Sequence, residues 1–151
     1  MTETTNEEKL TEFIQNEKFD DAYMLYKSGE IEPEMLKKIL TEVQIDTGTD
    51  LAFLSFALVL AQREKTILTN SIVVNLLVND NVDVPGSYFL AYEYFKKILQ
   101  EDPENIENLK SILFFNIVPN QVMSQRGAKF IAQKLNRKGV RNDDVDNILG
   151  L

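Results

Sequence analysis

Carboxylates are the residues of this sequence with the clearest potential for chemistry, because paired carboxylates can transfer protons or bind a cation. Asp80 lies close to Asp83, and Glu101 is followed by Asp102 and Glu104. The first group lacks the alternating ligands, the glycine and the distal glutamate of a calcium loop. The second group lies at a predicted helix start, where the helix dipole stabilises negative charge. Structural roles are therefore favoured for both groups.

Two residue types that carry much of enzyme chemistry do not occur in the sequence. The absence of histidine and cysteine removes imidazole acid–base chemistry, thiolate nucleophiles, disulfides and the usual zinc ligands. No GxGxxG, GxxxxGK[ST] or GxSxG motif occurs either. We therefore expect a protein that is not an enzyme and that has no cofactor and no metal site.

Charge is distributed unevenly along the chain, whose formal net charge is −8. Residues 1–120 contain 10 Lys/Arg against 21 Asp/Glu, a net charge of −11, whereas residues 121–151 contain 6 against 3, a net charge of +3. We therefore expect the body of the protein to attract a protein partner with a basic surface and to repel nucleic acid.

A run of cations near the C-terminus is not interrupted by any acid. It consists of Arg126, Lys129, Lys134, Arg137, Lys138 and Arg141. Cations in the last turns of a helix stabilise its dipole, and they could also neutralise the acidic body, so a structural role is favoured. Binding of phosphate or of an acidic partner is the alternative.

The length of the chain, 151 residues, fits one domain with an ordinary core. We predict a single all-helical domain over residues 5–151, after a frayed segment 1–4. The first residues are acidic and polar, unlike a secretory signal, so we expect a cytoplasmic protein. The longest strongly apolar run, 51–61, is too short for a bilayer, which needs about 20 residues, so we expect no membrane span.

The stretch from Ser87 to Asn105 predicts a helix, a tight turn and the start of a second helix. At about 100° per residue, one apolar band contains Tyr88, Ala91, Tyr92, Tyr94, Phe95, Ile98 and Leu99. A band this wide needs neighbouring helices on two sides. Asp102 is expected to cap the second helix, with Pro103 at its first position.

Caps and apolar periods predict about eight or nine helices in total. Besides the two above, they begin after Thr5, near Asp20, at Pro33, after Thr49 or Asp50, at Thr66, after Ser124 and after Asn142. The third of these is expected to end near Thr47 and Gly48. Residues 66–78 are rich in β-branched side chains, but their length and spacing favour a helix over a strand.

The pattern Ala91-x3-Phe95-x2-Ile98-x4-Pro103 resembles the second half of a tetratricopeptide repeat, although Ile98 stands where that repeat usually has a small residue. Similar alanines, Ala22, Ala57, Ala91 and Ala128, follow one another at intervals of 35, 34 and 37 residues, close to the repeat's period of about 34. Alanine is also common in any helix. The resemblance implies stacked antiparallel helical pairs in a short, degenerate solenoid.

Two tyrosines immediately follow periodic alanines, and in a solenoid they would face the same direction. Tyr23 follows Ala22, and Tyr92 follows Ala91. Tyrosine is over-represented in protein interfaces because its ring is apolar and its tip is polar. We therefore predict an aromatic, acid-flanked protein-binding groove that contains Tyr23, Tyr92, Glu101 and Glu104.

The sequence thus favours a protein-binding module. Residues 102–115, followed by Pro119, resemble small acidic immunity proteins that bacteria encode beside secreted toxins. This resemblance implies a protein that neutralises a cognate toxin by covering its basic catalytic cleft. The alternatives are a tetratricopeptide-like adaptor or secretion chaperone, and a nucleic-acid-associated regulator that uses the basic C-terminal helix.

Overall fold

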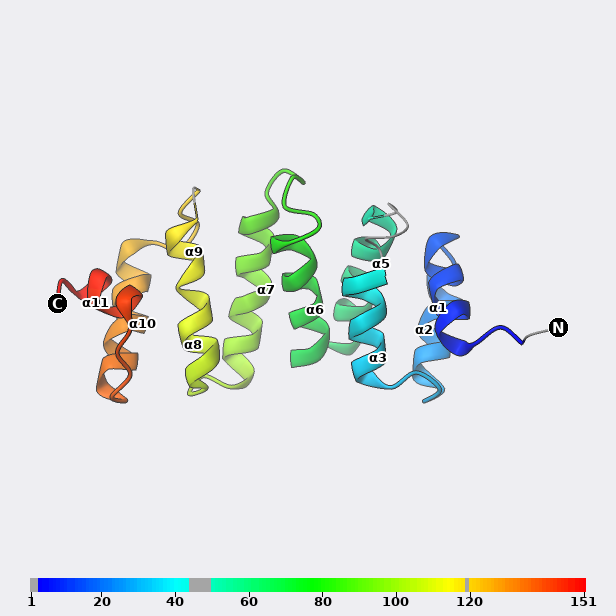
Figure 1. Cartoon of the computed structure of the whole chain (residues 1–151), viewed down its shortest axis with the longest axis horizontal. Helices are drawn as coiled ribbons and strands as arrows, with labels where there is room; N and C mark the ends of the chain where they lie inside the picture. Colours follow the sequence, from blue (N-terminus) through cyan, green and yellow to red (C-terminus); the bar gives the residue numbers. More distant parts are fainter. Residues whose placement is uncertain (1–2, 44–49, 119) are drawn as a thin grey trace. The chain divides into compact units, whose positions relative to one another are not determined.

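A computed structural model describes residues 3–43, 50–118 and 120–151, and every regular element in these residues is helical (Figure 1). If α3 and η1 are counted as one helix, and α8 and α9 as another, these residues form nine helices. The predicted all-α fold with packed helix pairs is therefore confirmed. None of the helices in the described ranges is long and apolar enough to cross a membrane.

The chain divides into two compact units, Met1–Ser87 (unit 1) and Tyr88–Leu151 (unit 2). Unit 1 contains α1 (Asn6–Gln15), α2 (Phe19–Lys27), α3 (Pro33–Lys38), the π-helix η1 (Ile39–Val43), α5 (Asp50–Glu64) and α6 (Ile67–Val78). Unit 2 contains nearly all of α7 (Ser87–Glu101), followed by α8 (Ile106–Ile112), α9 (Phe114–Ile117), α10 (Gln125–Arg137) and α11 (Asp143–Leu149). The single domain expected over residues 5–151 stays a prediction.

The core of unit 1 is built around α5 and α6. Helix α5 packs against α1, α2, η1 and α6, and α6 also contacts α3 and η1. Phe53, Phe56 and Leu60 of α5 are fully buried, as are Ile72 and Leu76 of α6. Burying such side chains stabilises the unit by roughly 1.5–3 kcal/mol each. The helix predicted over residues 66–78 is confirmed, because α6 begins after its N-cap Thr66 and ends at Val78. Its apolar residues are covered on several sides rather than on one face.

The core of unit 2 contains an aromatic cluster between α7 and α9. The ring of Phe115 lies 5.9 Å from that of Phe95 and 5.5 Å from that of Tyr92. Helix α10 packs against α8 and α11 through its buried residues Ala128, Ile131, Ala132 and Leu135. In Figure 1 these elements run from pale green, for α7, to red, for α11.

Most of the predicted helix ends are present. The side chains of Thr5, Ser124 and Asn142 accept hydrogen bonds from backbone N–H groups three residues later and so cap α1, α10 and α11. Gly29, after α2, has a φ of +83°, a conformation that glycine adopts at little cost. Three predictions fall at least partly outside the described residues. They are the end of the third helix at Thr47–Gly48, the cap of the next helix at Thr49, and residues 1–2 of the frayed segment 1–4.

The predicted cap at Asp102 is wrong. Helix α8 begins at Ile106, and its N-cap is Asn105, whose Oδ1 accepts a hydrogen bond of 2.9 Å from the backbone N–H of Asn108. Pro103 lies in the turn before it. Asn is as good an N-cap as Asp, and Asp102 instead accepts a 3.3 Å hydrogen bond from Asn105 Nδ2. Asp102 therefore supports the cap without forming it.

The four periodic alanines lie in α2, α5, α7 and α10, and each is at most 1% exposed. A side chain this small lets a neighbouring helix approach closely. The burial explains why small residues occur at these positions, whereas the resemblance to a tetratricopeptide repeat stays a prediction.

Candidate protein-interaction surfaces

Tyr23, one of the predicted binding residues, holds α2 to α5 within unit 1. Its hydroxyl donates a 2.9 Å hydrogen bond to Glu64 Oε1, which also pairs with Lys27 at 3.0 Å. The Arg63 guanidinium lies 4.9 Å from the centroid of the Tyr23 ring and pairs with Asp20 at 2.8 Å. Tyr23 is half-buried in this network, so its hydroxyl already has a partner in the fold.

The same contacts shift the ionisation of the network. The hydrogen bonds from Lys27 and from Tyr23 lower the pKa of Glu64. In return, the hydrogen bond to Glu64 raises the pKa of Tyr23 and also that of Lys27. These three pKa shifts keep Glu64 ionised, Lys27 protonated and Tyr23 neutral, which are the forms that bind one another. This indicates a structural role for the three residues.

Tyr92 lies half-buried on α7 in unit 2. Its ring contacts Phe115 on one side, and the Lys96 ammonium lies 4.8 Å from the ring centroid. Lys96 also forms a 2.8 Å ion pair with Glu93. Part of the tyrosine therefore belongs to the aromatic core, and part of it remains accessible to a partner.

The two predicted acidic residues lie near each other in the sequence, Glu101 at the end of α7 and Glu104 in the turn that follows, but they have different surroundings. Glu101 is exposed and forms no ion pair within the described residues. Glu104 pairs with Lys134 at 2.9 Å and also with Lys138. Hydrogen bonds from Lys138 and Lys134 lower the pKa of Glu104 to about 2. Glu104 therefore joins the turn before α8 to α10.

The structure brings Tyr92, Glu101 and Glu104 into unit 2 and places Tyr23 in unit 1. The groove predicted from all four residues stays a prediction. Two of its members, Tyr23 and Glu104, have partners inside their own units, which reduces what they can offer to another protein.

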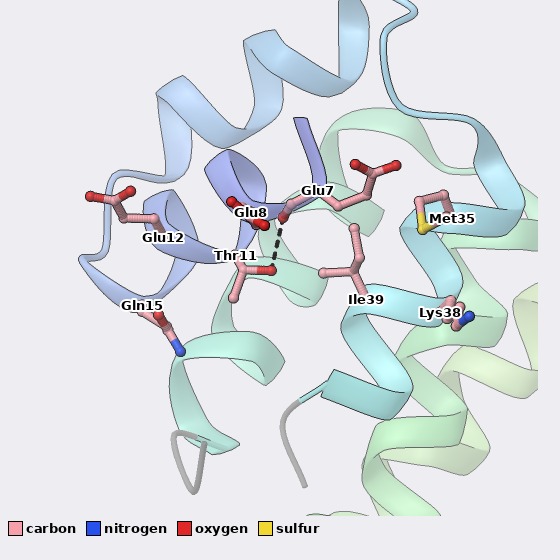
Figure 2. A pocket seen from close by; sticks show the side chains of 8 residues that line it. All are labelled: Glu7, Glu8, Thr11, Glu12, Gln15, Met35, Lys38 and Ile39. Carbon is pink, nitrogen blue, oxygen red and sulfur yellow. Dashed lines mark hydrogen bonds between the residues drawn. The ribbon is translucent and has the colours of Figure 1, made fainter. Parts of the chain in front are cut away.

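A different groove occurs in unit 1, between α1 and the α3–η1 segment. It is open to solvent and has a volume of about 540 Å³. We call it the acidic groove; its lining residues are Glu7, Glu8, Thr11, Glu12, Gln15, Met35, Lys38 and Ile39. Figure 2 shows Glu7 and Ile39 near the centre of the view, with Met35 and Lys38 on the facing helix. Glu7 thus lies opposite Met35 and Ile39, whereas the carboxylate of Glu12 points away from them in this view (Figure 2).

Helical spacing explains why these side chains share a groove. Glu8, Glu12 and Gln15 follow one another at intervals of four and three residues, while the buried Leu10 and Ile14 occupy a different face of α1. On the facing segment, Lys38 and Ile39 follow Met35 by three and four residues, which places all three on one face of a helix that begins at Pro33. Sequence reasoning missed the groove, although the stripe of Glu8, Thr11, Glu12 and Gln15 was visible.

Glu7, Glu8 and Glu12 form no ion pair within the described residues. Lys38 also lines the groove, so its formal net charge is −2. Met35 is half-buried and gives one wall an apolar surface, whereas Ile39 is only 2% exposed and adds little to it. The groove can therefore bind cationic and apolar groups together.

The six C-terminal cations separate into two sets. Lys134 and Lys138 pair with Glu104, and Arg141 pairs with Asp146 at 2.7 Å. The structural role favoured from the sequence therefore describes these three. Arg126, Lys129 and Arg137 are exposed on α10 and form no ion pair with acids of the described ranges.

Among the described residues, no three acids gather in an arrangement that could hold a metal ion. Glu101, Asp102 and Glu104 therefore do not form such a site. No protein-family model, curated protein or solved structure matches this chain.

Proposed function

We propose that this protein is a non-enzymatic protein-binding module that holds a basic, amphipathic segment of a partner in the acidic groove. The observation that carries the proposal is the composition of that groove of about 540 Å³, which is lined both by apolar side chains and by carboxylates that have no ion pair within the described residues. A lysine or arginine has an apolar stem and a charged head, so its two parts match the two walls.

The charge of unit 1 supports the same partner. Unit 1 contains 7 Lys/Arg against 16 Asp/Glu, a net charge of −9, whereas unit 2 contains 9 against 8, a net charge of +1. All of the net negative charge therefore lies in the unit with the acidic groove. Such a field attracts a cationic partner over about a Debye length and increases its rate of association.

Short-range contacts would then set the lifetime of the complex. Carboxylates on the rim attract and orient the partner, while contacts with Met35 exclude water and bury apolar area. Exposed ion pairs contribute little on their own, about 0–1 kcal/mol each. Affinity would therefore depend on apolar contact with Met35 as well as on charge.

Neutralisation of a bacterial toxin is the biological setting that we propose for this binding. It rests on the resemblance of residues 102–115 and Pro119 to immunity proteins, and a basic toxin surface would suit an acidic unit. A tetratricopeptide-like adaptor or secretion chaperone would use the same groove for a different basic segment. A toxin gene beside the gene for this chain supports the first setting, and a gene for a secreted substrate supports the second.

Selection from a random peptide library on the full chain tests the binding activity. We expect enriched peptides to combine lysine or arginine with apolar residues. The double variant Glu8→Gln, Glu12→Gln should lose these peptides, because it removes two rim charges. The matched double variant Glu30→Gln, Glu32→Gln removes two exposed acids of unit 1 that do not line the groove, and it should retain them.

Two results would contradict the proposal. The enriched peptides could be acidic or uncharged, which would show that the groove does not select basic segments. Alternatively, both double variants could lose basic peptides equally, which would show that binding depends on the net charge of unit 1 and not on the groove. Circular dichroism of each variant should match that of the original chain, so that a loss of binding is not a loss of fold.

A further inference from the structure

Helix α10 has an exposed stripe that the proposed function does not use. The stripe consists of Arg126, Lys129, Phe130, Gln133 and Arg137, which follow one another at intervals of three, one, three and four residues. At 100° per residue, all five fall within roughly a third of the helix circumference. The opposite face is buried, so the stripe is the solvent side of an amphipathic helix.

The cations of this stripe are available, in contrast to their neighbours. Lys134 and Lys138, farther around the helix, pair with Glu104. Arg126, Lys129 and Arg137 form no ion pair with acids in the described part of the chain. Three positive charges thus extend along one face over roughly 16 Å, at a rise of about 1.5 Å per residue.

An apolar anchor lies among these charges. Phe130 is 60% exposed although its ring is large and apolar. With Gln125, Arg126, Lys129 and Gln133, it lines a shallow depression of about 460 Å³ on the surface of α10. Aromatic residues, phenylalanine among them, and arginine are enriched in protein interfaces.

We propose that the α10 stripe is a second interaction surface, which binds an acidic helical segment of another protein. Carboxylates of such a segment would pair with Arg126, Lys129 and Arg137, and an apolar side chain between them would cover Phe130. This surface belongs to unit 2 and not to the unit with the acidic groove, and it binds a partner of the opposite charge. A module with both surfaces could hold a basic and an acidic partner at the same time.

Charge and apolar area favour a protein over the other anionic partners. A helix that binds a membrane inserts a whole apolar face, and its affinity scales with that area. The apolar face of α10 is buried in the fold, and Phe130 alone remains on the stripe. Nucleic-acid binding depends on neutralising many phosphates, whereas unit 2 has a net charge of +1 and the whole chain −8.

The direct test uses the full chain and a synthetic helical peptide. The peptide carries glutamates at the spacing of the three cations and leucines between them; a scrambled peptide of the same composition is the control. We expect saturable binding of the first peptide, with amide NMR shifts concentrated in α10. Phe130→Ala should weaken it by at least about fivefold, and the double variant Arg126→Gln, Arg137→Gln by about three- to tenfold.

A matched double variant distinguishes an effect of the stripe from an effect of the net charge of unit 2. Lys97→Gln with Lys110→Gln removes two cations of unit 2 that do not lie on α10, and it should leave binding unchanged. Equal losses in the two double variants, equal binding of the scrambled peptide, or no saturation by about 1 mM peptide would overturn the proposal. Tighter binding to vesicles of anionic lipid, to a DNA duplex or to a second copy of the chain would also overturn it.

Discussion

The two units of this protein use their acidic residues in different ways. In unit 2, ion pairs hold Glu93, Glu104, Glu107 and Asp146, which are half of the eight acids of the unit. In unit 1, Asp20 and Glu64 join α2 to α5, whereas the acids of the acidic groove form no ion pair in the described ranges. Half of the acids in unit 2 thus have a partner in the fold, whereas those of the acidic groove in unit 1 remain accessible.

This difference shows that net charge alone does not locate a binding surface. Glu104 carries the same charge as Glu8, yet two lysines already neutralise it. The cations of α10 differ in the same way, because Lys134 pairs with Glu104 and Lys129 has no ion pair with the acids that the structure describes. The candidate surfaces are therefore the places where charged side chains have no ion pair within the described residues.

The largest effect should come from the aromatic core of unit 2. Phe95 is 9% exposed and its ring contacts Phe115, so Phe95→Ala should lower the free energy of unfolding by about 3–5 kcal/mol. Chemical denaturation followed by far-UV circular dichroism measures the change. Lys97→Ala, on the exposed side of α7, removes a contact with the Tyr94 ring and should cost at most about 1 kcal/mol. Equal costs would mean that α7 faces the other way.

The paired acid of unit 2 predicts a dependence on pH. The pKa of Glu104 falls from 4.5 to about 2 in the fold, so its contribution to stability is complete above pH 4.5 and is lost as pH falls toward 2. Glu104→Gln should therefore lower stability at neutral pH, and the difference from the original chain should vanish near pH 2. An NMR titration of the carboxyl groups measures the pKa directly.

Glu101→Gln is the control for this variant. Glu101 is exposed and forms no ion pair among the described residues, so its loss should leave stability nearly unchanged at every pH. A normal pKa for Glu104, or equal effects of the two substitutions, would show that the pairs with Lys134 and Lys138 do not persist in solution.

A smaller effect is expected at Tyr23 in unit 1. Tyr23→Phe removes the hydroxyl that binds Glu64 but keeps the ring beneath Arg63. Stability should fall by less than in Phe95→Ala, and the pKa of Glu64 should rise, because one of the two hydrogen bonds that lower it is lost. Chemical denaturation measures the change in stability, and the same NMR titration of the carboxyl groups measures the pKa of Glu64. An unchanged Glu64 pKa would remove Tyr23 from the structural network and return it to the candidates for partner binding.

The helices could be predicted from the sequence because their signals are local. Ser124 caps α10 as expected, α6 begins one residue after the predicted start at Thr66, and the apolar residues of α7 follow one helical period. The start of α8 was missed because Asp102 and Asn105 are both good caps, and sequence alone does not choose between them. The choice depends on the geometry of the whole turn.

The candidate surfaces could not be predicted as well, because they depend on partners that are distant in the sequence. Glu104 meets Lys134 across 30 residues, and the acidic groove joins α1 to Met35 and Ile39. Each residue has an ordinary explanation in its own helix: Glu8 stabilises a helix start, and Met35 fits an apolar stripe. Only their arrangement in space separates paired charges from available ones.

The most direct test of the two-surface account is an amide NMR titration of the full chain with a basic, leucine-containing helical peptide. The account predicts shifts concentrated in α1, α3 and η1, saturation at one site, and loss of the shifts in the double variant Glu8→Gln, Glu12→Gln. It also predicts that the double variant Arg126→Gln, Arg137→Gln on α10 leaves these shifts in place. Shifts spread over all exposed acids, or centred on Tyr92 and Glu101, would contradict the account.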